Sequence, residues 1–122
     1  MPDALFVYGS LRSPCDNPHA HFLRTHARLR GPATVRGSIF RIGTYPGYRA
    51  EPDGIVHGEL WHLPDPAPVL TALDHYEGPE YSRVETLVEI DPETPLISAW
   101  IYLYIGAAPT NQRIQSGDFL AP

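Results

Sequence analysis

A glutamate in an apolar setting is the residue of this chain best suited to proton transfer. Glu77 stands at the end of the segment 66–78, whose apolar residues repeat at helical spacing: Val69, Leu70, Leu73 and Tyr76. Because Glu77 follows Leu73 by four residues, it projects on the side of the predicted helix that faces the core. Desolvation and the negative end of the helix dipole both disfavour its charge, so we expect a raised pKa, as a general base near neutral pH requires.

The helix that carries Glu77 has recognisable ends. Asp65 can cap its start, Pro66 suits the first helical position, and Gly78 suits the exit. The alternative for Glu77 is a carboxylate at the end of the helix that bends out to solvent. The residues alone leave both interpretations open.

A second candidate site follows the first apolar run, 4–8. The sequence there is Tyr8-Gly9-Ser10-Leu11-Arg12. A Gly-Ser turn at the end of a buried strand lets successive backbone N–H groups point at one spot, where they can bind an anion or a carbonyl oxygen. An ordinary turn is the alternative for this pentapeptide.

The elements that must position these residues are short. We expect strands over 4–8, 34–42, 55–63, 81–90 and 96–105, a turn at 45–48, and an extended tail that closes over the sheet with Phe119 and Leu120. We expect helices over 19–29, ended by Gly31-Pro32, and over 66–77. Most strands are joined without crossover helices, which favours antiparallel pairing. The predicted fold is α+β: a small mixed, mainly antiparallel β-barrel of about six strands with two helices.

Composition limits the classes of function. The 122 residues, 43% of them hydrophobic, suit a single domain over 1–122. No apolar run could span a membrane, no signal peptide is recognisable, and Cys15 is the single cysteine, so we expect a cytoplasmic protein without a disulfide. The net charge of −5 argues against nucleic acid as a partner. The sequence does not indicate an oligomeric state.

Other chemistries are disfavoured. His57 and Glu59 lie two residues apart with His62 nearby, but no Cys pair or His-Glu-x-x-His run accompanies them. Cys15 lies in a loop without an evident oxyanion partner, and no nucleophile-elbow pattern surrounds Ser10. No Walker or dinucleotide fingerprint is present. We therefore expect neither a metal nor an organic cofactor.

Four short motifs, taken together in this order, are similar to those of a known family. They are Tyr8-Gly9-Ser10-Leu11, the run from Leu73 to Gly78, Tyr81-Ser82-Arg83 and Ser116-Gly117-Asp118. In their joint order and spacing the chain resembles the γ-glutamylcyclotransferase-like family, which includes the AIG2-like proteins and the γ-glutamylamine cyclotransferases. The resemblance runs from residue 5 to about residue 119.

The resemblance implies a mixed barrel with a cavity at the end of its first strand. It implies that Glu77 is the catalytic glutamate and that Tyr8, Gly9, Ser10 and Leu11 form the substrate-binding loop. A tyrosine on the last long strand would face the cavity. Tyr104 is the best match and would orient the substrate together with Tyr81, and Tyr102 is the second choice. Tyr81 and Arg83 fall where the family closes the cavity.

The implied activity is that of a γ-glutamyl cyclotransferase, a cofactor-independent transferase or lyase. The substrate's α-amine would attack its own γ-carbonyl, with Glu77 as general acid/base, and release 5-oxoproline and a free amine or amino acid. One alternative is a non-catalytic module that binds a small zwitterionic or amide ligand in the same cavity, and another is an interaction protein whose cavity is filled. The leaving amine and the roles of Arg12, Arg83 and Tyr45 stay open.

Overall fold

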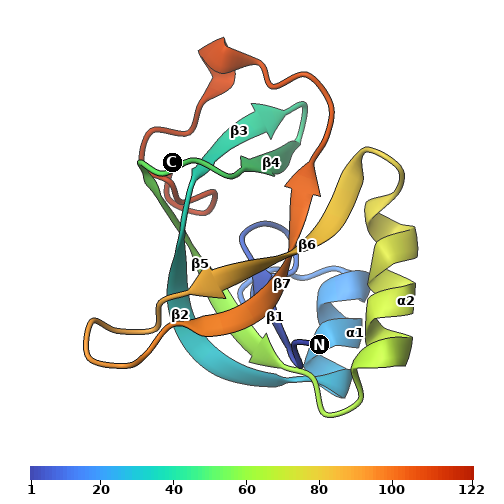
Figure 1. Ribbon diagram of the computed structural model, residues 1–122. Helices are drawn as coiled ribbons and strands as arrows, with labels where there is room; N and C mark the ends of the chain where they lie inside the picture. Colours follow the sequence, from blue (N-terminus) through green and yellow to red (C-terminus); the bar gives the residue numbers. More distant parts are fainter.

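Seven strands curl into one mixed sheet with two helices on one side (Figure 1). The computed structural model describes all residues, 1–122. The elements in chain order are β1 (Ala4–Val7), α1 (Pro18–His26), β2 (Arg28–Arg36), β3 (Ser38–Ile42), β4 (Tyr45–Arg49), β5 (Ile55–His62), α2 (Pro66–Glu77), β6 (Tyr81–Val88), β7 (Ile97–Tyr104) and a 3₁₀ turn, η1 (Thr110–Gln112). Neither helix is long and apolar enough to cross a membrane.

The sheet has the strand order β2-β5-β1-β7-β4-β3, and β6 also pairs with β7. Four pairings are antiparallel, whereas β7 pairs in parallel with both β1 and β4. Thr34 and Glu89 exchange two backbone hydrogen bonds of 2.9 Å, which join β2 to the end of β6 and close five strands into a ring. The mixed, mainly antiparallel barrel-like fold predicted from the sequence is confirmed, with seven strands in place of six.

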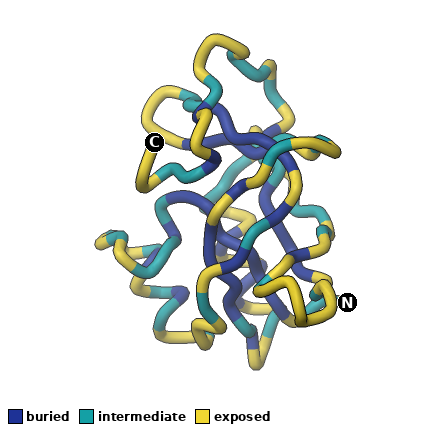
Figure 2. The backbone as a smooth tube through the Cα atoms, turned by 90° about the vertical axis from the view of Figure 1, so that its left-hand side faces the viewer, coloured by how far each residue is buried: buried dark blue, intermediate teal, exposed yellow.

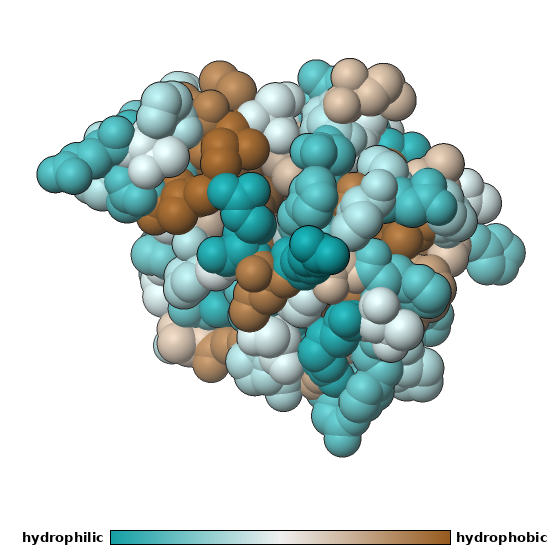
Figure 3. All heavy atoms as spheres, turned by 90° about the horizontal axis from the view of Figure 1, so that it is seen from below, coloured by the Kyte–Doolittle hydropathy of each residue, from teal (hydrophilic) through white to brown (hydrophobic).

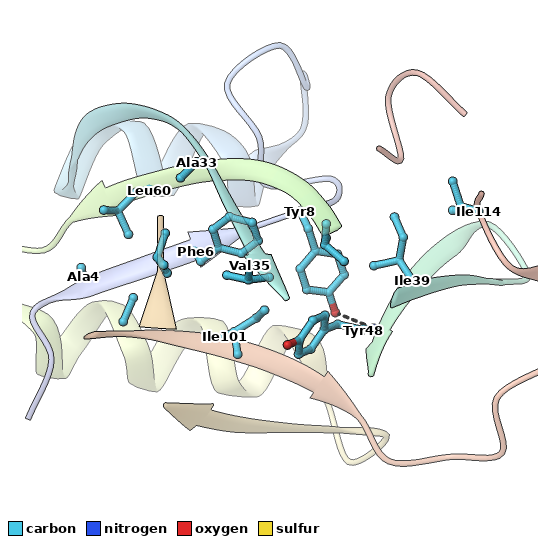
Figure 4. Close-up of a cluster of buried hydrophobic side chains, with 13 residues drawn as sticks. Ala4, Phe6, Tyr8, Ala33, Val35, Ile39, Tyr48, Leu60, Ile101 and Ile114 are labelled. Carbon is cyan, nitrogen blue, oxygen red and sulfur yellow. Dashed lines mark hydrogen bonds between the residues drawn. The ribbon is translucent and has the colours of Figure 1, made fainter. Parts of the chain in front are cut away.

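Strand β1 is buried on both faces, and its two faces belong to two cores. Ala4 and Phe6 point into the barrel, where they join a cluster that also holds Tyr48 and Ile101 (Figure 4). Leu5 and Val7 point to the other face, where α1 and α2 cover the sheet. Side chains that alternate along a strand thus tie the barrel to the helical layer. The buried backbone follows the strands, and the exposed backbone lies in the loops and at the termini (Figure 2).

The boundaries around the first helix differ from the prediction. Helix α1 ends at His26, and β2 begins at Arg28. The Gly31-Pro32 pair does not end the helix; it lies inside β2, where the register shifts between Leu29 and Gly31. The tertiary pairing of β2 with β5 overrides the local helix signal.

Two further boundaries, those of the expected strand 34–42 and the expected turn at 45–48, differ from the prediction at glycine residues. The expected strand 34–42 is divided into β2 and β3 at Gly37, which has a φ of 143° and whose Cβ position lies 2.5 Å from the carbonyl oxygen of Arg49. The expected turn at 45–48 is strand β4, and the chain instead reverses at Gly43. Gly47 is needed there because a Cβ would come within 2.9 Å of the Tyr104 side chain.

Helix α2 spans Pro66–Glu77, as the sequence predicts. Pro66 starts it, although Asp65 makes no side-chain capping bond. Gly78 ends it with a φ of 79° and donates its N–H to the carbonyl oxygen of Asp74 at 3.2 Å. The tail includes η1 and packs Phe119 against the barrel core, whereas Leu120 is exposed.

The lower surface of the molecule is mostly polar, with an apolar area beside a projecting polar tip (Figure 3). The hairpin between β6 and β7 carries two exposed apolar side chains, Leu87 and Leu96.

Candidate active site

A cavity of about 240 Å³ opens where β1 and α2 both end. Five predicted site residues of the first loop and α2 line it: Tyr8, Gly9, Ser10, Leu11 and Glu77. The rest of the wall is formed by Phe6, Val7, Ile42, Tyr45, Pro46, Tyr76, Pro79, Glu80, Tyr81 and Tyr102. Residues far apart in the sequence thus meet at one end of the first strand.

Glu77 is the last residue of α2, and its carboxyl group belongs to the wall of this cavity. Its helix buries Leu70 and Leu73 against the sheet, and Glu77 at the end of this helix is half-buried. Burial raises the pKa of Glu77 to about 7, and no ion pair or hydrogen-bond donor opposes this shift. A carboxyl group with this pKa can accept and return a proton at neutral pH.

The loop after β1 presents three unused backbone donors. No acceptor within the chain takes the N–H of Gly9, Ser10 or Leu11. The carbonyl oxygen of Gly9 accepts from the Arg12 N–H at 3.1 Å, and that of Ser10 accepts from Asn17 Nδ2 at 2.8 Å. Because a trans peptide points its C=O and N–H in opposite directions, these bonds turn the next N–H groups away from the loop's interior. The three successive N–H groups of Gly9, Ser10 and Leu11 form what we call the nest, an arrangement of a kind that suits an anion.

A buried glutamate that the sequence analysis assigned no role anchors this loop. Glu59 accepts hydrogen bonds from the Ser13 N–H at 2.6 Å, from Ser13 Oγ at 2.5 Å and from Trp61 Nε1 at 3.3 Å. Arg24 donates to the carbonyl oxygen of Ser13 at 3.1 Å. The available signal was an acidic residue in the apolar strand 55–63, since such a residue needs partners when buried.

Two arginines whose roles were left open by the sequence form ion pairs outside the cavity wall. Arg12 pairs with Asp118 at 2.6 Å and fastens the loop to the C-terminal tail. Arg83, which falls where the family closes the cavity, binds Asp74 through two nitrogens, at 2.8 and 3.1 Å, and lies over the ring of Trp100. Both guanidinium groups are therefore already paired with a carboxylate.

The hydroxyl groups of two tyrosines on the wall form hydrogen bonds with backbone atoms. The Tyr8 hydroxyl donates to the carbonyl oxygen of Tyr102 at 2.6 Å and accepts from the Tyr48 N–H at 3.2 Å (Figure 4). The Tyr81 hydroxyl donates to the carbonyl oxygen of Pro46 at 2.9 Å. Burial raises the pKa of both Tyr8 and Tyr81, and the nearby charge of Glu77 raises it further. These residues contribute shape and packing more than free polar groups.

The tyrosine of β7 that lines the cavity is Tyr102. Tyr104, the first choice from the resemblance, is not in the wall; its ring packs edge-on behind Tyr81 at 5.5 Å between centroids and fills the space left by Gly47. The Tyr102 hydroxyl donates to Asp74 Oδ1 at 2.7 Å. Its oxygen can therefore still accept a hydrogen bond from a molecule in the cavity.

The residues weighed for metal binding do not gather. Glu59 holds Ser13, and His62 Nδ1 lies 3.6 Å from a carboxylate oxygen of Asp3. No group of three or more His, Cys, Asp or Glu side chains is placed to hold a metal ion. The Cys15 thiol lies 3.7 Å from the carbonyl oxygen of Gly9, and burial raises its pKa.

Comparison with known proteins identifies the family. Residues 5–121 match the family model described as gamma-glutamyl cyclotransferase, AIG2-like. The gamma-glutamylcyclotransferase family protein YtfP of Escherichia coli K12 is 37% identical over 120 residues, which cover 95% of each chain. The chain belongs to this family. The resemblance noted from the sequence motifs is thereby confirmed.

Solved structures agree with the fold. The solution structure of Escherichia coli YtfP superposes with a TM-score of 0.68 and 32% identity, covering 97% of this chain and 96% of that one. An AIG2-like protein of Mus musculus superposes with a TM-score of 0.71 at 22% identity, covering 88% of this chain and 80% of that one, and this likeness concerns the fold alone.

Proposed function

We propose that this protein is a γ-glutamyl cyclotransferase that converts a γ-glutamyl amide into 5-oxoproline and a free amine. The observation that carries the proposal is the pairing of Glu77 with the nest of Gly9, Ser10 and Leu11 in one cavity. One is a half-buried carboxyl group with a pKa of about 7, and the other is a set of three unused backbone donors. Family membership supports the same reaction class.

The reaction needs proton transfer and positioning, and the cavity offers groups for both. Ionised Glu77 takes a proton from the substrate's α-ammonium group. The neutral amine attacks the γ-carbonyl carbon, a new C–N bond forms, and the bond to the leaving nitrogen breaks. The ring nitrogen ends with one hydrogen, and the two protons it gives up pass through Glu77 to the leaving nitrogen. Nucleophile and electrophile belong to one molecule, so binding in a folded shape supplies much of the rate.

The nest and Tyr102 contact different polar groups of the glutamyl moiety in this proposal. The three N–H groups hold the α-carboxylate or the oxygen that becomes negative on the γ-carbon. The Tyr102 oxygen accepts a hydrogen bond from the α-amine, because its own hydrogen is held by Asp74. Arg83 fixes the direction of the hydrogen bond between Tyr102 and Asp74. Burial raises the Asp74 pKa, but the hydrogen bonds from Arg83 and Tyr102 outweigh it and lower the pKa, so Asp74 stays ionised and accepts.

The test is direct measurement of 5-oxoproline. Purified protein is incubated with γ-glutamyl amino acids and with γ-glutamyl-lysine, and wild type is compared with Glu77→Gln. We expect Glu77→Gln to lose about a thousandfold in kcat/KM, the scale of general acid/base catalysis, while its circular dichroism is unchanged. Glu85→Gln, which removes the same charge from an exposed position of β6 outside the cavity, serves as the matched control.

Two outcomes would reject the proposal. If Glu77→Gln turns over normally, the glutamate is not the proton-transfer group. If wild type binds 5-oxoproline but releases none from any γ-glutamyl amide, the cavity belongs to a binding module.

A further inference from the structure

The mouth of the cavity differs in character from its interior. The most exposed wall residues are Tyr45, Pro79 and Glu80, and they form the opening. The reacting end lies deeper, at Glu77 and the nest. In the proposed reaction the leaving amine must therefore extend past Tyr45 and Glu80 to reach solvent.

The wall of the cavity carries negative charge and no positive charge. Its ionisable side chains are Glu77, Glu80 and tyrosines, and none of the chain's nine Lys and Arg or six His residues belongs to it. Arg83 and Arg12 are paired with carboxylates, and Arg49 donates to the carbonyl oxygen of Gly106. A carboxylate on the leaving group would find no cationic partner in this wall.

The nest serves only the glutamyl end. Gly9, Ser10 and Leu11 offer one set of donors, which the α-carboxylate or the developing oxyanion occupies. A second carboxylate, next to the scissile nitrogen as in a γ-glutamyl α-amino acid, would lie between Glu77 and Glu80 without a donor. Such an arrangement is repulsive.

Glu80 is free to bind a cation. Its backbone is fixed, because its carbonyl oxygen accepts from the Ile105 N–H at 2.9 Å, whereas its side chain forms no ion pair. Tyr45, also at the mouth, is 58% exposed and offers an aromatic ring. A carboxylate attracts an ammonium group, and the face of an aromatic ring attracts it as well.

We infer that this chain selects γ-glutamyl amides whose leaving amine carries a second positive charge, and that Glu80 is the residue that recognises this charge. The inference rests on the proposed function and names the substrate class for it. Tyr45 supports the same cation with its ring.

Three substrates whose leaving groups each contain a chain of four carbons test the inference. They are the γ-glutamyl conjugates of 1,4-diaminobutane, butylamine and 4-aminobutanoate, which end in an ammonium, a methyl and a carboxylate group. At low ionic strength we expect kcat/KM to fall in that order by about fivefold per step, the effect of one exposed charge at close range. The spread should shrink in 0.5 M NaCl, because salt screens exposed charges.

Two variants separate the role of Glu80 from a general charge effect. Glu80→Gln should reduce the ratio of cationic to anionic kcat/KM by about fivefold. Glu85→Gln should leave that ratio as in wild type. Equal turnover of the three substrates, a preference for the carboxylate, or an unchanged ratio in Glu80→Gln would overturn the inference alone. Turnover of none of the three would overturn the inference, and it would overturn the proposed function as well if the γ-glutamyl amino acids and γ-glutamyl-lysine also gave no 5-oxoproline.

Discussion

Glu59 is buried and Glu77 is half-buried, and the surroundings of the two carboxylates are opposite. Glu59, on β5, accepts three hydrogen bonds and is 8% exposed. Glu77, at the end of α2, has no donor, and burial alone raises its pKa to about 7. One lies beneath the loop that carries the nest, and the other lies in the cavity that the nest lines.

The contrast shows what hydrogen-bond donors do for a carboxylate away from bulk water. Three donors fix Glu59 as an anchor for the loop at Ser13. Without donors, Glu77 has nearly equal free energies in its two protonation states at neutral pH, which suits a proton shuttle. The proposed site therefore depends on a hydrogen-bonded glutamate for its shape and on a glutamate without donors for its chemistry.

The largest effect on stability should come from removing the anchor. Glu59→Ala leaves the Ser13 donors without their acceptor, and two bonds to a charged group imply a loss of about 4 kcal/mol in unfolding free energy. Glu59→Gln keeps one acceptor oxygen and should lose about half as much. Urea denaturation at pH 7 measures both. If Glu59→Ala stays within about 1 kcal/mol of wild type, the loop does not depend on this glutamate.

The pH dependence of stability should single out Glu77. Its folded pKa is raised from 4.5 to about 7, so the neutral form favours folding. The stabilisation is full below pH 4.5 and is lost as the pH rises through 7, a change of about 3 kcal/mol. Glu77→Gln cannot ionise, so its unfolding free energy relative to wild type should rise by that amount between pH 4 and pH 8.

Urea denaturation curves across this pH range provide the measurement, and Glu85→Gln is the control for removal of an ordinary exposed glutamate. Parallel profiles for wild type and Glu77→Gln would mean that Glu77 titrates normally and faces solvent. That result would remove the contrast between the two glutamates.

A smaller effect is expected at Asn17, which joins the nest to α1. Asn17 accepts from the Ala20 N–H at 2.9 Å and donates to the Ser10 carbonyl oxygen at 2.8 Å. Asn17→Ala should lose about 2 kcal/mol in unfolding free energy, from one helix cap and one hydrogen bond. Asn17→Ser, which keeps a cap but cannot reach Ser10, should recover about half of the loss. Equal stability for the two variants would show that the cap contributes nothing.

The parts of the molecule that depend on local pattern were predictable, and those that depend on pairing were not. The helix of Glu77 has periodic apolar residues, a first-turn proline and a terminal glycine, and its bounds were predicted. Strand β4 was not, because Tyr45-Pro46-Gly47-Tyr48 has turn-forming residues and only its pairing with β3 and β7 makes it a strand. The sequence could indicate that an acidic residue in the apolar strand 55–63 needs partners. It could not indicate that Ser13 is the partner of Glu59, because Ser13 lies 46 residues away.

The smallest expected effect distinguishes the two tyrosines of β7, which share the parity of their strand but differ in surroundings. Tyr102 lines the cavity and keeps a free acceptor, whereas the Tyr104 ring lies behind Tyr81. In the proposed reaction Tyr102→Phe removes one hydrogen bond to the substrate amine, so kcat/KM should fall about fivefold. Tyr104→Phe should stay within about twofold of wild type, since it removes no cavity group. The opposite ranking in a 5-oxoproline assay would return the orienting role to Tyr104 and would mean that the β7 wall rearranges when substrate binds.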